Sequence, residues 1–113
     1  MHVYGLKNCD TCRKAMKALD SANVRYNFHD VREEPVTTMQ IGRWAEAVGT
    51  EKLLNQSSTT WRNLPEADKR NVDGKKAIKL MVEHPTLIKR PVIERGPTQV
   101  YVGWSADVQK EIL

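Results

Sequence analysis

The hydrophobic period of the chain changes twice within residues 2–31. Residues 2–6 form a short run rich in β-favouring side chains, which predicts a buried strand. From residue 10 to about residue 22, apolar side chains recur at offsets of three and four, the pattern of an amphipathic helix. Residues 24–31 alternate apolar and polar side chains, the period of a strand with one buried face. The sequence therefore opens as strand, helix and strand.

The middle of the chain is predicted to be mostly helical. A helix over residues 39–48 has Thr37 or Thr38 as its candidate N-cap, and residues 53–64 could hold a helical turn or two. A strongly amphipathic helix begins at Asp73. It ends before the next proline, because the residue that precedes a proline avoids the helical region.

The last part of the chain returns to strands. Residues 91–94 and 99–102 predict a β-hairpin whose turn is Arg95-Gly96-Pro97, and Ser105 caps a final helix. Together with the opening strands, the hairpin completes a mixed four-stranded sheet with helices on its faces. The expected fold class is therefore α/β.

Composition and charge exclude several classes of protein. The 113 residues carry 18 Lys and Arg against 14 Asp and Glu, and 40% hydrophobic residues supply a core. The basic residues are scattered and no nucleic-acid-binding motif accompanies them, so we expect no direct nucleic acid binding. No apolar run approaches the ~18–20 residues that span a bilayer, and the opening residues are no signal peptide. We expect a cytoplasmic protein with no membrane partner.

The two cysteines form a Cys9-Asp10-Thr11-Cys12 segment where the first strand meets the first helix. A thiol at a helix N-terminus faces unsatisfied N–H groups and the positive end of the helix dipole, and both favour the thiolate. Nearby Lys7, Arg13 and Lys14 could add positive potential. Cys12 lies about one turn further along the helix, where it can attack a mixed disulfide on Cys9. The spacing predicts Cys9 as the nucleophile and Cys12 as the resolving thiol.

Other interpretations of the cysteine pair stay open. Half of a zinc site is disfavoured because a structural site needs four ligands, and the chain has no second cysteine pair and no short His-to-His spacing. We therefore expect no metal. Cys12 could simply be a small core residue on the apolar stripe of its helix. An inert packing role suits Cys9 less well, because loops that follow parallel strands are where α/β proteins bind ligands.

The segment from Tyr4 to Ala15 resembles the opening of the ArsC/Spx family, which includes glutaredoxin-coupled arsenate reductases. Further matches run through the chain in order: Phe28-His29-Asp30, Leu54-Asn55, Thr59-Thr60-Trp61-Arg62-Asn63-Leu64, Ile88-Lys89-Arg90-Pro91-Val92 and Val102-Gly103-Trp104. Within the family, the chain is most similar to the small YffB-type proteins. The resemblance implies a thioredoxin-like fold and a single domain over residues 1–113, with a helical insertion at about residues 37–84.

The resemblance also implies roles for individual residues. Cys9 matches the family's nucleophile, and Arg13 matches the arginine four residues later. Arg90 matches an anion-binding arginine, and Pro91 the proline after it, which is cis in relatives and presents backbone to a substrate thiol.

The chain departs from the arsenate reductases at several positions. Gly5 stands where they carry a histidine, and Asn55 and Gly103 stand where they place two further anion-binding arginines. Arg62 could partly substitute for these. Because charge-assisted arginine contacts are the strong ones, we expect arsenate binding to be severely weakened.

Three functions follow from the resemblance. We favour an enzyme, an arsenate reductase-like thiol–disulfide oxidoreductase that uses glutathione as co-substrate and has no tightly bound cofactor. Its expected partners are glutathione or another thiol or disulfide substrate, with glutaredoxin as a further candidate. One alternative is an Spx-type redox-sensing regulator that binds RNA polymerase. The second alternative is a true glutaredoxin-coupled arsenate reductase.

Overall fold

The computed structural model describes residues 1–96 and 98–113, which form two compact units. The first unit comprises residues 1–34 and 90–113, and the second comprises residues 35–89. Pro97, which the sequence places in the hairpin turn, lies outside the described residues.

The first unit is built on a mixed four-stranded sheet with the order β2-β1-β3-β4. Strand β1 (His2–Gly5) runs parallel to β2 (Asn27–Asp30) and antiparallel to β3 (Val92–Glu94), which pairs antiparallel with β4 (Val100–Val102). This confirms the predicted sheet and hairpin. Strand β2 is shorter than the predicted 24–31, because β1 offers only four residues for it to pair with.

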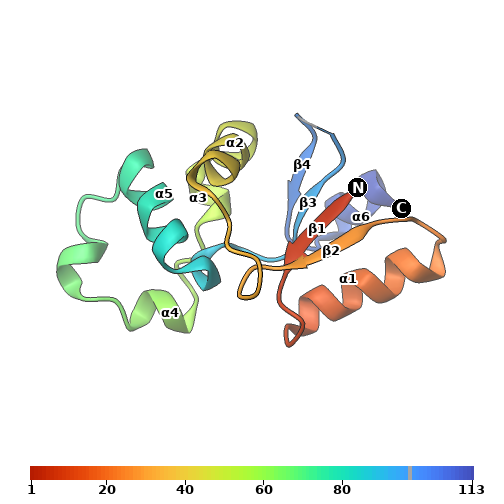
Figure 1. Cartoon of the computed structure of the whole chain (residues 1–113), viewed down its shortest axis with the longest axis horizontal. Helices are drawn as coiled ribbons and strands as arrows, with labels where there is room; N and C mark the ends of the chain where they lie inside the picture. Colours follow the sequence, from red (N-terminus) through yellow and green to blue (C-terminus); the bar gives the residue numbers. More distant parts are fainter. Residues whose placement is uncertain (97) are drawn as a thin grey trace. The chain divides into compact units, whose positions relative to one another are not determined.

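Helices α1 (Asp10–Ser21) and α6 (Ala106–Ile112) pack on the same face of this sheet (Figure 1). The core cluster takes Val3 from β1, Leu19 from α1, Ile93 from β3 and Ile112 from α6. The apolar stripe read from the sequence is the buried side of α1, where Cys12, Ala15 and Leu19 are fully buried. This packing fixes the start of α1 against the end of β1.

The second unit is helical. Its elements are α2 (Thr38–Val48), α3 (Thr50–Leu53), α4 (Thr59–Arg62), the 3-10 turns η1 (Glu66–Lys69) and η2 (Pro85–Leu87), and α5 (Gly74–Glu83). Thr37 and Asp73 cap α2 and α5 as the sequence predicts, each accepting a backbone N–H bond with its side chain. Within residues 53–64 the helical turn is α4, whereas α3 begins earlier, at Thr50.

The boundaries of the helical unit differ slightly from the expected insertion at about 37–84. The unit extends to residue 89 because residues 53–55 and 87–89 pair in an antiparallel manner. The Asn55 N–H donates to the Leu87 carbonyl at 2.8 Å, the Lys89 N–H donates to the Leu53 carbonyl at 2.8 Å, and Leu54 forms a bridge with Ile88. These bonds hold the two ends of the insertion together.

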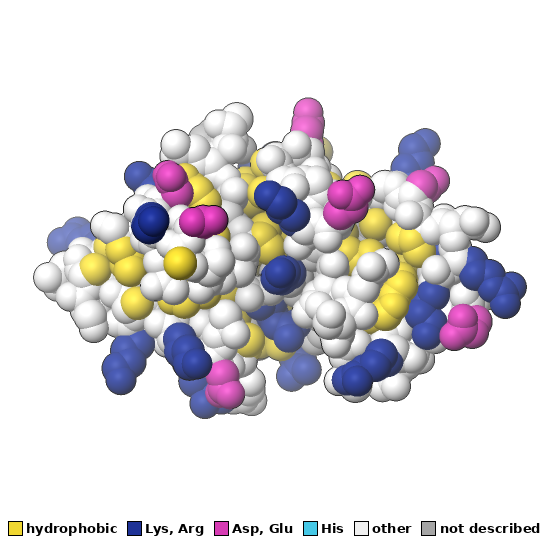
Figure 2. Space-filling model, turned by 180° about the vertical axis from the view of Figure 1, so that it is seen from behind, with side chains coloured by type: hydrophobic (Ala, Val, Ile, Leu, Met, Phe, Trp, Pro, Cys, Tyr) yellow, Lys and Arg dark blue, Asp and Glu magenta, His cyan; other side chains and the backbone are white. Residues whose placement is uncertain are grey.

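On the face drawn in Figure 2, the charged side chains are dispersed. Figure 2 shows lysine and arginine side chains spread over the visible face, with aspartate and glutamate side chains between them. None of the described helices is both long enough and apolar enough to cross a membrane.

Candidate functional site

Cys9 occupies the N-cap position of α1, in the loop that follows β1. Its backbone is extended, with φ of −114° and ψ of 122°, and its carbonyl accepts the Arg13 N–H at 2.9 Å, the first bond of the helix. Cys9 is partly exposed, and a nucleophilic cysteine must be accessible to its substrate.

The surroundings of Cys9 lower the pKa of its thiol below the ordinary value. Partial burial by itself raises the pKa, but the Cys12 backbone N–H, the Cys12 thiol and the Arg90 guanidinium all interact with the sulfur and outweigh it. Cys12 is the third residue of the helix, so its free N–H is one of the N-terminal donors invoked from the sequence. The direction of the shift agrees with the prediction.

The positive charge next to Cys9 comes from a different residue than the sequence neighbours suggested. The Lys7 ammonium pairs with Glu33 at 2.9 Å. The Arg13 guanidinium donates to the Lys7 carbonyl at 3.2 Å and lies 3.7 Å from the Asp10 carboxylate. Arg90, far away in sequence, contacts the Cys9 sulfur instead. The role of Arg13 in anion binding stays a prediction.

Cys12 has the opposite environment. It is completely buried on the inner side of α1. Burial, followed by the proximity of the Cys9 sulfur, raises the pKa of Cys12 to about 12, although the Leu6 backbone amide works against this rise. When one thiol of the pair ionises, it is therefore Cys9, while Cys12 stays a thiol. Such a pair can carry out thiol–disulfide exchange with Cys9 as the attacking group.

Pro91 lies between Arg90 and the start of β3, and the Arg90–Pro91 peptide bond is cis. The Pro91 carbonyl accepts the Gly103 N–H at 2.8 Å, which ties the proline to the end of β4. Gly103 has a φ of 83°, a conformation that favours glycine over residues with a Cβ. An arginine at position 103 would thus be strained, and the Gly103 amide is already committed to Pro91.

Asp30, at the end of β2, is a site residue that the sequence reasoning missed. Its carboxylate accepts the Lys7 N–H at 3.0 Å and the Arg32 N–H at 2.9 Å. Burial by itself raises the pKa of Asp30, but the backbone N–H groups of Lys7, Arg32 and Glu33 outweigh it and lower the pKa. The available signal was the Phe28-His29-Asp30 segment, where an acid ends a strand parallel to β1.

Asn55 and Arg62 lie in the helical unit. The Asn55 side-chain oxygen accepts the Ser57 N–H at 3.0 Å and so shapes the turn that leads into α4. The exposed Arg62 donates to the Thr59 hydroxyl at 3.2 Å, within α4 itself. The described contacts of both residues are therefore with their own unit, and their part in anion binding stays a prediction.

Two further features of the first unit involve other residues. The first is a pair of histidines: the His2 and His29 rings are hydrogen-bonded at 2.9 Å, and His29 contacts the Glu34 carboxylate at 2.6 Å. These side chains do not form a metal site, since across the residues that the structure describes no group of three or more His, Cys, Asp or Glu is placed to hold a metal ion.

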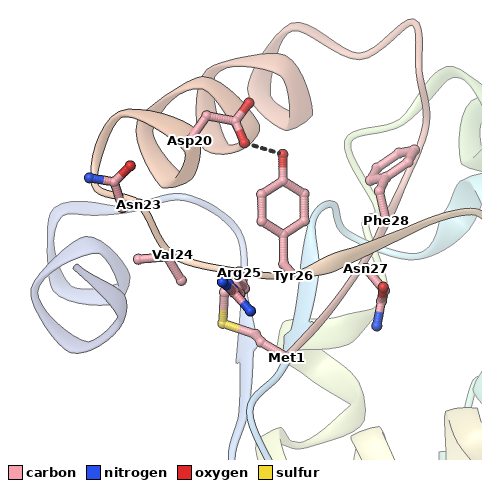
Figure 3. Close-up of a pocket in the computed structure, with 8 residues that line it drawn as sticks. All are labelled: Met1, Asp20, Asn23, Val24, Arg25, Tyr26, Asn27 and Phe28. Atoms are coloured by element: carbon pink, nitrogen blue, oxygen red, sulfur yellow. Dashed lines mark hydrogen bonds between the residues drawn. The ribbon is translucent and has the colours of Figure 1, made fainter.

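The second feature is an open hollow of about 920 Å³ at the other end of α1 (Figure 3). In it the Tyr26 hydroxyl donates to the Asp20 carboxylate at 3.0 Å. Helix α1 has 12 residues and is therefore ~18 Å long, so this hollow is separate from the cysteine site.

Comparison with known proteins identifies relatives along almost the whole chain. The model of the ArsC family matches residues 4–112. An uncharacterized protein of Haemophilus influenzae is 43% identical over 91 residues, which is 80% of each chain. The global transcriptional regulator Spx 1 of Lactococcus lactis is 29% identical over 93% of this chain and 82% of its own. A solved structure named YFFB protein superposes with a TM-score of 0.94 at 40% identity, covering 99% of this chain and 97% of that one. This structural match confirms the thioredoxin-like fold that the family resemblance implied.

Proposed function

This chain belongs to the ArsC family, and we propose that it is a glutathione-dependent thiol–disulfide oxidoreductase with Cys9 as its nucleophile. The observation that carries the proposal is the opposite setting of the two cysteines. Cys9 is partly exposed with a lowered pKa, whereas Cys12 is buried with a pKa raised to about 12. Of the two thiols, Cys9 is the one that is both accessible and more readily ionised.

In the proposed first step, the Cys9 thiolate attacks one sulfur of a disulfide RS–SR′. A bond forms between the Cys9 sulfur and the RS sulfur, the original S–S bond breaks, and R′S⁻ leaves and takes up a proton from water. The lowered pKa of Cys9 supplies the thiolate for this attack.

The mixed disulfide on Cys9 is then resolved by a second thiolate. If Cys12 attacks the Cys9 sulfur, RS⁻ leaves and an internal disulfide forms, which two glutathione molecules reduce while becoming glutathione disulfide. If glutathione attacks instead, a second glutathione completes the same exchange. Cys12 becomes a better attacker at this stage, because the negative charge on Cys9, one cause of its raised pKa, has disappeared. Either route oxidises two glutathione molecules for each disulfide reduced.

Arg90 supplies the positive charge at this site. Its guanidinium interacts with the Cys9 sulfur in the thiolate form. When Cys9 enters a mixed disulfide, its sulfur loses its negative charge. The Arg90 guanidinium can then bind a carboxylate of glutathione. Charge-assisted bonds between arginine and carboxylate are among the stronger polar contacts in proteins.

The proposal is tested by turnover. Purified protein is mixed with hydroxyethyl disulfide, glutathione, glutathione reductase and NADPH, and the loss of NADPH is followed. We expect activity that Cys9→Ser abolishes and that Arg25→Ala, an exposed arginine at the other end of α1, leaves unchanged. Retained activity in Cys12→Ser would assign resolution to glutathione. No activity above the uncatalysed rate, with or without added glutaredoxin, would reject the proposal.

A second candidate function is a redox-sensing regulator, and it is favoured by the 29% identity to Spx 1 of Lactococcus lactis. In that case a Cys9–Cys12 disulfide would change the affinity for RNA polymerase. A pull-down of purified polymerase with reduced and oxidised protein tests this function directly. Both functions are placed in the cytoplasm, where the glutathione pool keeps such thiols reduced.

A further inference from the structure

Gly5, the last residue of β1, has no space for a side chain. A Cβ atom built on Gly5 would lie 2.5 Å from the Cys12 sulfur, far inside van der Waals contact. The next atoms are the Cys12 Cβ at 3.5 Å and the Phe28 Cε1 at 3.6 Å, which are ordinary contact distances. A single atom, the Cys12 sulfur, therefore excludes a side chain from this position.

The backbone conformation at position 5 does not require a glycine. Gly5 is paired with Asp30 in the parallel ladder and its φ lies outside the left-handed region, whereas Gly49 and Gly103 have positive φ. Any residue could adopt such a strand backbone. The requirement at position 5 is one of space.

The location of this contact follows from the fold. Gly5 and Val3 lie on the same face of the sheet because they are two residues apart in one strand. That face is covered by α1, whose first turn brings Cys12 over the end of β1. Cys12 is completely buried, so its sulfur has no solvent-filled space into which it could move.

We propose that Gly5 is a positioning residue for the cysteine pair: the absence of its side chain creates the space that the Cys12 sulfur fills next to Cys9. The inference rests on the proposed function, because it concerns the same two thiols. A side chain at position 5 would push the Cys12 thiol out of its place. The Cys12 thiol is one of the groups that stabilise the Cys9 thiolate, so its displacement should make Cys9 less acidic.

The test compares Gly5→Ala in two backgrounds. In the wild-type background we expect Cys9 to be alkylated by iodoacetamide roughly tenfold more slowly at pH 7, with the pH profile moved to higher pH. In a Cys12→Ala background the nearest atoms to the added methyl group are the Cβ at position 12, at 3.5 Å, and the Phe28 Cε1, at 3.6 Å, both ordinary contact distances. There Gly5→Ala should leave the pH profile of Cys9 unchanged.

Gly42→Ala is the matched control, because a Cβ at Gly42 would meet nothing within 4 Å. It should leave the pH profile of Cys9 alkylation unchanged and should not lower the melting temperature. If Gly5→Ala alone does not fold, folding must be restored when Cys12→Ala is added, and failure of the double variant to fold would overturn the proposal. Equal effects in both backgrounds, or no effect in the wild-type background, would also overturn it. Alkylation requires no glutathione turnover, so a failed reductase assay would leave this result intact.

Discussion

The Lys7 N–H donates a 3.0 Å hydrogen bond to the carboxylate of Asp30, and this bond joins the end of β2 to the loop that carries Cys9. On the other side of the same residue, the Lys7 carbonyl accepts from the Arg13 side chain at 3.2 Å. Lys7 is therefore held by its backbone N–H and by its backbone carbonyl. The nucleophile is positioned by a loop whose anchor belongs to a neighbouring strand.

Asp30→Asn should destabilise the fold, because the amide keeps an acceptor oxygen but loses the charge that strengthens two backbone bonds. We expect a loss of about 2 kcal/mol in the free energy of unfolding at pH 7, measured with urea. Glu33→Gln is the control, since the Glu33 side chain forms an exposed ion pair with Lys7 and its replacement, which keeps the backbone N–H, should cost under about 1 kcal/mol.

The effect of Asp30→Asn should also depend on pH in a defined direction. Because the pKa of Asp30 is lower in the folded than in the unfolded chain, its carboxylate stabilises the fold above a pH of about 4. That contribution is lost as the pH falls through the lower folded value. The difference in stability between wild type and Asp30→Asn should therefore shrink on acidification from pH 7 to 3, and a constant difference would contradict the assignment.

The two thiols should react differently with iodoacetamide. In Cys12→Ser the remaining Cys9 should be alkylated at neutral pH, with a midpoint below the ordinary thiol pKa of about 8.5. In Cys9→Ser the remaining Cys12 should resist the reagent until the chain unfolds, because it is fully buried. Mass spectrometry over a pH series identifies the modified residue. Rapid alkylation of Cys12 in folded Cys9→Ser would make the nucleophile assignment wrong.

Arg90→Ala should change both the pKa of Cys9 and the affinity for glutathione. Removing the guanidinium raises the pKa of Cys9, because one of the groups that stabilise the thiolate is lost. It should also weaken binding of glutathione roughly 10- to 150-fold, the equivalent of one charge-assisted bond of about 1.5–3 kcal/mol. Arg90→Lys should recover part of the alkylation rate but less of the binding. Calorimetric titration that shows unchanged affinity would exclude Arg90 from the glutathione site.

The hydrophobic pattern predicted the parts of the site that depend on local order, whereas the distant residues Arg90 and Pro91 were indicated only by the family resemblance. The strand, the helix and the N-terminal position of Cys9 follow from hydrophobic period, which is a local property. The contacts of a lysine or arginine side chain depend on residues that are distant in the sequence. Lys7 points to Glu33, and the cation beside Cys9 is Arg90, which reaches the site through the pairing of β3 with β1.

Local pattern also overestimated the length of β2. Residues 24–31 alternate as a strand should, yet only Asn27–Asp30 form one. The residues before Asn27 complete the exit from α1, where the Val24 N–H donates to the Leu19 carbonyl at 2.9 Å and Asn23 has a φ of 57°. The exclusion of a side chain at Gly5 could not be foreseen either, because it depends on how closely α1 approaches β1.

Arsenate reduction should be poor or absent, and the structure adds a reason at position 103. Gly103 has a positive φ and its N–H is bonded to the Pro91 carbonyl, so it offers an oxyanion neither a cation nor a free amide. Asn55 is uncharged, so it replaces an arginine with at most a neutral donor. A tetrahedral oxyanion held against Cys9 needs several fixed donors, and the loss of two charge-assisted contacts corresponds to about 10²–10⁴-fold.

The measurement is arsenate-dependent oxidation of NADPH in an assay coupled through glutathione and glutaredoxin, run beside the disulfide assay on the same preparation. We expect disulfide turnover with no arsenate turnover above background. Gly103→Arg should not restore arsenate activity, because its backbone conformation disfavours a Cβ. Robust turnover at sub-millimolar arsenate would contradict the prediction. Its loss in Arg62→Ala would then place Arg62, whose described bond is only to the Thr59 hydroxyl, at the anion site.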